Sequence, residues 1–104
     1  MPVVVVAFLH PKPEHRDEVR EVITAAIPKV HAEEGCELYS LNENPDGFAI
    51  IEQWTSTEAL TAHGQQPVLA EMNAALKGKM SAPADLNLLG PVPAGDPAKG
   101  QVRP

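Results

Sequence analysis

The pattern of apolar and polar positions along the chain predicts strands and helices in a definite order. Residues 3–9 are apolar on both faces and rich in β-branched side chains, which is typical of a buried strand. Two further strands are predicted at 36–43 and 48–54, and the Asn-Pro-Asp-Gly turn at 44–47 joins them into a hairpin. A fourth strand is predicted at 85–90, after which the alternation stops.

Helices are predicted in the two intervals between these strands. The first begins near Pro13 and ends before Gly35, a residue type that favours the end of a helix. Ser56 is the expected N-cap of a short helix that runs to about residue 63, and Pro67 opens another helix. The apolar stripe of the first helix, at helical spacing, consists of Val19, Val22, Ile23, Ala26, Ile27 and Val30. The order β-α-β-β-α-β predicts an α+β, ferredoxin-like βαββαβ fold with a four-stranded antiparallel sheet.

Both faces of this sheet are predicted to be apolar. The third strand places Phe48 and Ile50 on one face, and it places Ala49 and Ile51 on the other. Helices can cover only one of the two faces, and a second copy of the sheet is the simplest cover for the other. We therefore expect a homodimer.

Composition narrows the class of protein. The chain has 104 residues, of which 43% are hydrophobic, so it fits one domain with a modest core. Its formal charge of −6 and the lack of a basic stripe argue against a nucleic-acid or membrane partner. No apolar run is long enough to span a membrane, and no signal peptide is recognisable. Cys36 is the only cysteine and is expected to be a small buried hydrophobe, which suits a cytoplasmic location.

The last part of the chain differs in composition from the rest. Five of the eleven prolines lie from Pro83 onward, and residues 91–104 have no periodicity. We expect residues 2–90 to form the domain and residues 91–104 to form a Pro/Gly-rich C-terminal tail, extended or disordered.

Three segments resemble the antibiotic biosynthesis monooxygenase (ABM) family. They are Leu-His-Pro-Lys-Pro at 9–13, Ala-Glu-Glu-Gly-Cys at 32–36, and Glu-Gln-Trp-Thr-Ser-Thr-Glu-Ala-Leu-Thr-Ala-His at 52–63. That family includes quinol monooxygenases, anthrone-type oxygenases and more distant haem-degrading enzymes. The resemblance covers about residues 3–90. It implies a dimeric α+β barrel, in which two sheets pack face to face and each subunit has a cavity between sheet and helices.

The resemblance also implies a reaction. Members that use neither metal nor flavin oxidise a small aromatic, phenol or quinol with O₂, because the deprotonated substrate supplies the electron. Such an enzyme needs a dry apolar pocket, a base, and polar groups that hold the developing anion. No cofactor is then required.

Three residues are candidates for catalysis. His63 lies between the two C-terminal helical segments, and its imidazole is a side chain suited to proton transfer, although a histidine there could equally cap the helix end or meet solvent. Trp54 could line a flat aromatic ligand and donate its N–H, or it could simply pack in the core. Tyr39, the only tyrosine, could hydrogen-bond a quinol oxygen or pack in the dimer barrel.

Three more residues are candidates for substrate binding. Glu52 shares a strand face with Trp54 and could be a proton acceptor with a raised pKa, or an exposed or paired carboxylate. Asn73 lies beside Met72 on the last helix, where its amide could reach a cavity or remain solvated.

Other chemistries have less support. The remaining histidines do not show the close spacing of a metal site, and neither a phosphate-binding loop nor a nucleophile elbow is present. The haem-degrading relatives carry an iron-binding histidine on the last helix, whereas residues 67–76 contain none. Two alternatives remain open: a non-catalytic ligand-binding or structural dimeric barrel, and a haem-binding or haem-degrading protein.

Overall fold

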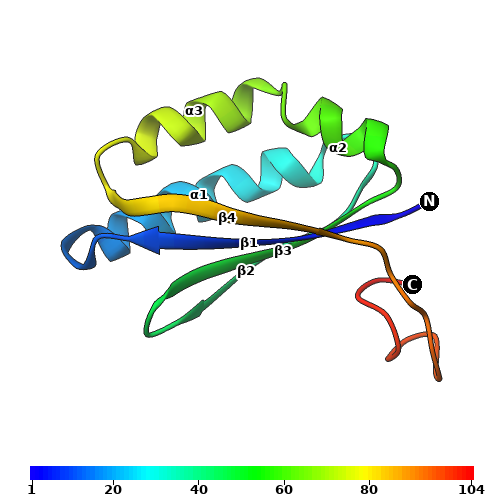
Figure 1. The fold of residues 1–104 in the computed structure, drawn as a ribbon. Helices are drawn as coiled ribbons and strands as arrows, with labels where there is room; N and C mark the ends of the chain where they lie inside the picture. The colour runs from blue at the N-terminus through cyan, green and yellow to red at the C-terminus, as the bar shows by residue number, and fades with distance from the viewer.

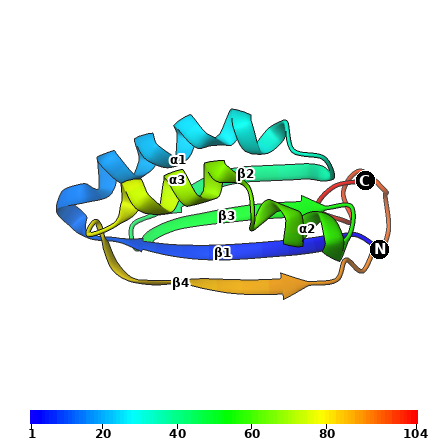
Figure 2. The same ribbon diagram turned by 90° about the horizontal axis from the view of Figure 1, so that it is seen from above.

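One antiparallel sheet carries all the helices on the same face (Figures 1 and 2). The computed structural model describes residues 1–104, and the strand order in the sheet is β2-β3-β1-β4. This order is that of the α+β, ferredoxin-like fold, so the predicted fold class is confirmed. The elements are β1 (Val3–Pro11), the 3-10 turn η1 (Pro13–His15), α1 (Arg16–His31), β2 (Cys36–Asn44), β3 (Gly47–Trp54), α2 (Thr57–His63), α3 (Pro67–Leu76) and β4 (Met80–Leu89).

The core lies between the sheet and the helices. In the register of the two central strands, Val5 of β1 pairs with Glu52 of β3, and Ala7 pairs with Ile50. Since side chains alternate along a strand, these positions all point to the helical layer. The thirteen buried core residues are Val5, Ala7, Val19, Ile23, Ala26, Val30, Tyr39, Phe48, Ile50, Trp54, Val68, Met72 and Leu76.

The predicted helical features are confirmed. The positions of the α1 stripe either are buried or pack against the core, with Val19 and Ile23 completely buried. Ser56 caps α2, because its Oγ accepts a hydrogen bond from the backbone N–H of Ala59 at 3.1 Å.

The β2–β3 hairpin also forms at the predicted turn. Oδ1 of Asn44 accepts hydrogen bonds from the backbone N–H groups of Asp46 and Gly47, at 2.8 and 3.0 Å. A Cβ atom at Gly47 would lie 2.3 Å from the carbonyl oxygen of Leu9, so only glycine fits where the hairpin meets β1.

The start of β4 differs from the prediction. The strand begins at Met80 and not at Asp85, so Pro83 lies inside it. β4 is an edge strand with a pairing partner on one side only, and a proline without an N–H is tolerated there. The sequence around Pro83 lacks alternation because this strand is largely exposed, which explains why the pattern missed its first half.

The face of the sheet opposite the helices is covered at one end only. Residues 91–104 contain no helix or strand, and they lie on this open face near the end of β3 (Figure 1). Nε2 of Gln53 donates a hydrogen bond to the carbonyl oxygen of Arg103 at 3.1 Å. Phe8 and Leu89, also on this face, remain 45% and 49% exposed.

None of the helices combines the length and hydrophobicity needed to cross a bilayer.

Candidate functional site

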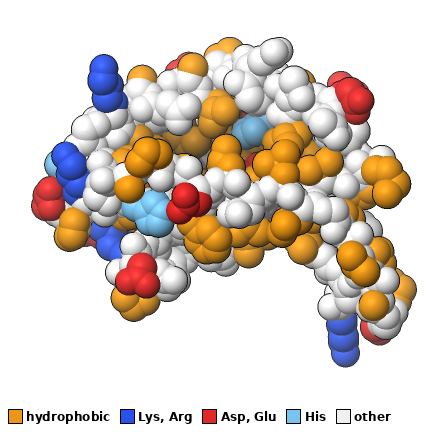
Figure 3. Space-filling view, viewed as in Figure 1, with side chains coloured by type: hydrophobic (Ala, Val, Ile, Leu, Met, Phe, Trp, Pro, Cys, Tyr) orange, Lys and Arg blue, Asp and Glu red, His pale blue; other side chains and the backbone are white.

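A cavity of about 430 Å³ lies between the sheet and the helices α2 and α3. Sixteen residues line it, and twelve of them are hydrophobic. Figure 3 shows apolar side chains gathered around this hollow, between α3 and β4. Leu86 and Leu88 of β4, which are 66% and 60% exposed, stand on its outer side. The volume and the apolar lining are those of a small-molecule site.

A hydrogen bond between a histidine and a glutamate lies at the polar end of the cavity. Nδ1 of His63, the last residue of α2, is 2.9 Å from Oε1 of Glu33, and the two side chains are only 7% and 10% exposed. An ionised carboxylate can only accept, so Nδ1 carries the proton of this hydrogen bond. Nε2 has no hydrogen-bond partner in the protein and is not among the fully enclosed atoms, so it remains accessible on the cavity side. A neutral imidazole fixed in this way presents Nε2 as a proton acceptor.

Gly35 explains how Glu33 reaches His63. The α1–β2 loop contains Glu33 and Gly35. Gly35 has a φ of +85°, a backbone conformation that favours glycine. Its carbonyl oxygen accepts a hydrogen bond from the N–H of Thr55 at 2.9 Å. A Cβ at position 35 would lie 2.6 Å from the Cβ of Ala59, so the loop packs directly against α2. This contact holds the loop, and with it Glu33, beside the helix that ends in His63.

Two aromatic rings pack against the imidazole. The Trp54 ring centroid lies 4.5 Å from that of His63, and the Tyr39 ring meets the imidazole edge-on at 5.7 Å. Trp54 is completely buried and lies behind His63, and it is not one of the lining residues. Its Nε1 donates a hydrogen bond to Oε1 of Glu52 at 2.9 Å. The indole therefore supports two polar groups of the site from the core side.

Burial raises the pKa of two lining residues. It raises the pKa of the Glu52 carboxyl, and the hydrogen bond from Trp54 opposes this only in part. It also raises the pKa of Tyr39, and the nearby carboxylates of Glu52 and Glu33 add to that effect. The Tyr39 phenol thus stays protonated as a hydrogen-bond donor.

The structure brings most of the predicted residues to one cavity. Met72 and Asn73 of α3 line it, with Met72 buried and Asn73 exposed at the rim. The predicted residues that line the cavity are Tyr39, Glu52, His63, Met72 and Asn73. Glu33 was not predicted, although it lies in the Ala32–Cys36 segment that carries part of the family resemblance. That segment is the only sequence signal that could have found it.

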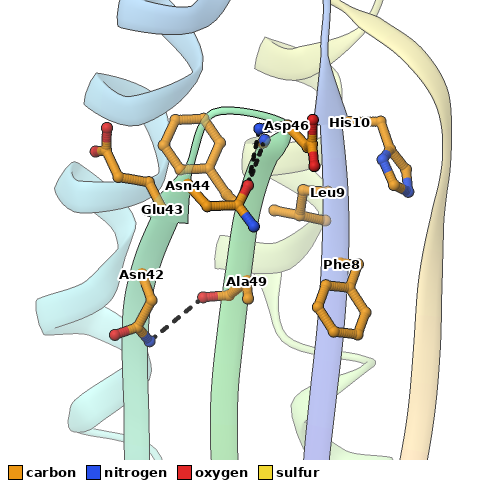
Figure 4. A pocket seen from close by; sticks show the side chains of 10 residues that line it. Phe8, Leu9, His10, Asn42, Glu43, Asn44, Asp46 and Ala49 are labelled. Atoms are coloured by element: carbon orange, nitrogen blue, oxygen red, sulfur yellow. Dashed lines mark hydrogen bonds between the residues drawn. The ribbon is translucent and has the colours of Figure 1, made fainter.

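A second hollow, of about 390 Å³, lies at the hairpin end of the open face (Figure 4). Its amide side chains are already used to hold the hairpin: Asn44 binds the turn, and Nδ2 of Asn42 donates to the carbonyl oxygen of Ala49 at 3.4 Å. No group of three or more His, Cys, Asp or Glu residues is close enough together to hold a metal ion. The cavity with His63 is therefore the better candidate for a functional site.

Comparisons with known proteins agree with this architecture. The family model described as antibiotic biosynthesis monooxygenase matches residues 2–75. Rv0793 of Mycobacterium tuberculosis, which is named as a monooxygenase, is 31% identical over 93 residues, covering 88% of this chain and 92% of the relative. Its solved structure superposes with a TM-score of 0.84 over 92% of this chain and 100% of the other. YgiN of Escherichia coli K12, which is named as a quinol monooxygenase, is 32% identical over 87 residues, covering 71% of this chain and 84% of the relative.

Proposed function

The chain belongs to the antibiotic biosynthesis monooxygenase family, and on that premise we propose that it oxidises a small phenol or quinol with O₂, using neither metal nor flavin. The observation that carries this proposal is the His63–Glu33 pair, in which the free Nε2 of His63 opens onto a mainly apolar cavity. The name of the YgiN relative supports a quinol as the substrate class.

The first step is removal of a proton from a substrate hydroxyl by Nε2 of His63. Glu33 holds the Nδ1–H and stabilises the imidazolium that forms, as a carboxylate does for a histidine base. The apolar lining excludes water, so the resulting anion stays electron-rich.

The oxidation then needs no further reagent than O₂. The substrate anion transfers one electron to O₂, and the superoxide and aryl radical combine at a ring carbon to give a peroxide anion. The peroxide takes back the proton from His63 and loses water, which leaves a new carbonyl on the ring. One oxygen atom enters the product, the other leaves in water, and His63 returns to its neutral form.

The other predicted residues position the substrate. The Tyr39 hydroxyl donates a hydrogen bond to a substrate oxygen, and Glu52 accepts or donates a hydrogen bond at the same wall. Asn73 offers its amide at the rim, and Met72 packs against the ring. Trp54 fixes the positions of His63 and Glu52 from behind.

The direct test is oxygen uptake with a panel of quinols and anthrones. We expect His63→Gln to lower kcat about 100-fold, the usual contribution of a general base, without unfolding the protein. The matched control is His15→Gln, since the His15 ring is hydrogen-bonded to Glu18 and does not line the cavity. Uptake no faster than in buffer across the whole panel would instead support the non-catalytic ligand-binding alternative. A Soret shift on adding hemin would support the haem alternative, although α3 places no histidine at the cavity.

We also propose that two copies pair through the open faces of their sheets. The apolar side chains on this face include Val6, Phe8, Ile51 and Leu89, and the helices leave them uncovered. Pairing would bury this face in the way that the α+β barrel of the family implies.

A further inference from the structure

The cavity has an acidic side chain in its lining and no permanently basic one. None of its sixteen lining residues is a lysine or an arginine. Glu52 lies in the lining, and the Glu33 carboxylate lies directly behind His63. His63 is the only lining side chain able to carry a positive charge, and its Nδ1–H is already bonded to Glu33. A bound ligand thus meets the Glu52 carboxyl directly, has the Glu33 carboxyl behind His63, and meets no lysine or arginine.

The carboxyl groups of Glu33 and Glu52 receive few hydrogen bonds from the protein. Oε2 of Glu33 is fully buried and has no hydrogen-bond partner. Glu52 receives one hydrogen bond, from Trp54. On the outer side of the cavity stand Leu86 and Leu88, which offer no donor to a ligand. An anionic group placed here would lose its hydration, and it would find the Tyr39 phenol and the Asn73 amide as donors but no cation. It would also be repelled by the two carboxyl groups when these are ionised.

We infer that this cavity selects uncharged hydroxyarenes and excludes those that carry a carboxylate or another fixed negative charge. The inference rests on the proposed function only in taking this cavity as the ligand site. The hydroxyl that loses its proton to His63 is no exception, because that proton stays inside the site and the net charge of the complex does not change.

The test compares two ligands that differ in charge and hardly in shape. Methyl 2,5-dihydroxybenzoate is uncharged, and 2,5-dihydroxybenzoate carries one negative charge at neutral pH. Calorimetric titration without oxygen measures both affinities and prevents turnover. We expect the ester to bind at least ten-fold more tightly than the acid. Equal affinities, tighter binding of the acid, or binding of neither ligand would overturn the inference.

Variants of Glu33 and Glu52 test whether these carboxyl groups cause the difference in affinity between the ester and the acid. Glu33→Gln and Glu52→Gln keep the side-chain shape and an acceptor oxygen, and we expect at least one of them to narrow the difference in affinity several-fold. Glu58→Gln is the matched control, because it removes the same charge from an exposed position in the first turn of α2. An unchanged difference in both site variants, with native circular dichroism, would overturn the assignment to these carboxyl groups.

This experiment separates the inference from the proposed function. Binding is measured without O₂, so a preference for the ester can be found even if no oxygen uptake is ever observed. That result would sustain the selection rule for the cavity while the proposed oxidation failed.

Discussion

At the scale of single residues, the burial of Glu52 makes ionisation of its carboxyl group unfavourable. Glu52 is 5% exposed, it lies among apolar side chains, and it receives a single hydrogen bond from Trp54. A buried carboxylate with one donor is less stable than the same group in water, so burial raises the pKa of Glu52. The folded protein therefore binds the Glu52 proton more tightly than the unfolded chain does.

This difference predicts how stability depends on pH. Since the pKa of Glu52 is higher in the folded state, its contribution to stability falls as pH rises from the ordinary carboxyl pKa to the raised one, and it stays low above that. Glu52→Gln cannot ionise and keeps an acceptor for Trp54. We expect its melting temperature, relative to wild type, to increase between about pH 4 and pH 8.

Thermal melts across that pH range check the prediction, with Glu58→Gln as the control for the loss of one charge from an acidic protein. A constant difference between Glu52→Gln and wild type over the range would contradict it.

The site residues also show what a sequence can predict. Glu52 and Tyr39 share the helix-facing side of the sheet, which strand alternation predicts, and Ser56 and Pro67 place the helix that ends in His63 beside it. The contact of Glu33 with His63 instead spans 30 positions and comes from a loop. Loops have no periodicity, so nothing in the local pattern could indicate this partner.

At the scale of elements, buried segments were predicted better than exposed ones. The α1 stripe and the β2–β3 hairpin were placed correctly, because burial imposes a period and the turn needs particular residues. The predicted start of β4 was five residues too late, since an exposed edge strand needs neither a periodic pattern nor particular turn residues. The α1–β2 loop is the element on which the site depends most, because it carries Glu33 to α2.

We expect Gly35→Ala to destabilise the protein by about 2 kcal/mol or more. An alanine would have to adopt a positive φ, which costs roughly 1–2 kcal/mol, and its Cβ would collide with Ala59. The collision would also move the loop, so oxygen uptake should fall in the fraction that remains folded.

Urea unfolding measures the loss of stability in Gly35→Ala, and Gly78→Ala is the matched control. Gly78 has a similar φ of +81°, but a Cβ there meets nothing within 4 Å. Gly78→Ala should lose only the conformational part, roughly 1–2 kcal/mol, and so less than Gly35→Ala. Equal losses at positions 35 and 78 would show that the contact with α2 is unimportant.

At the scale of the whole molecule, the two faces of the sheet have different covers. The helices enclose one face, and residues 91–104 lie on the other at the end where Val4 pairs with Gln53. Those two residues are buried, whereas Phe8 at the opposite end is 45% exposed. The tail therefore leaves most of the open face available to a second copy of the chain.

The last prediction concerns this remaining surface. Phe8→Lys places a charge on the uncovered part of the open face, within the proposed dimer interface, and Asp85, its neighbour on β4, can pair with the lysine in a monomer. The monomer should therefore stay folded, while a charge buried between two sheets should weaken association by about 100-fold. Sedimentation of wild type at micromolar concentration should give twice the 11.1 kDa mass of the chain, and Phe8→Lys should shift it to the single mass. Ala70→Asp puts a charge on an exposed position of α3, on the helical side, and should sediment like wild type. If wild type sediments at 11.1 kDa, the open face is not a self-association surface, and the exposed Phe8 must be explained by another partner.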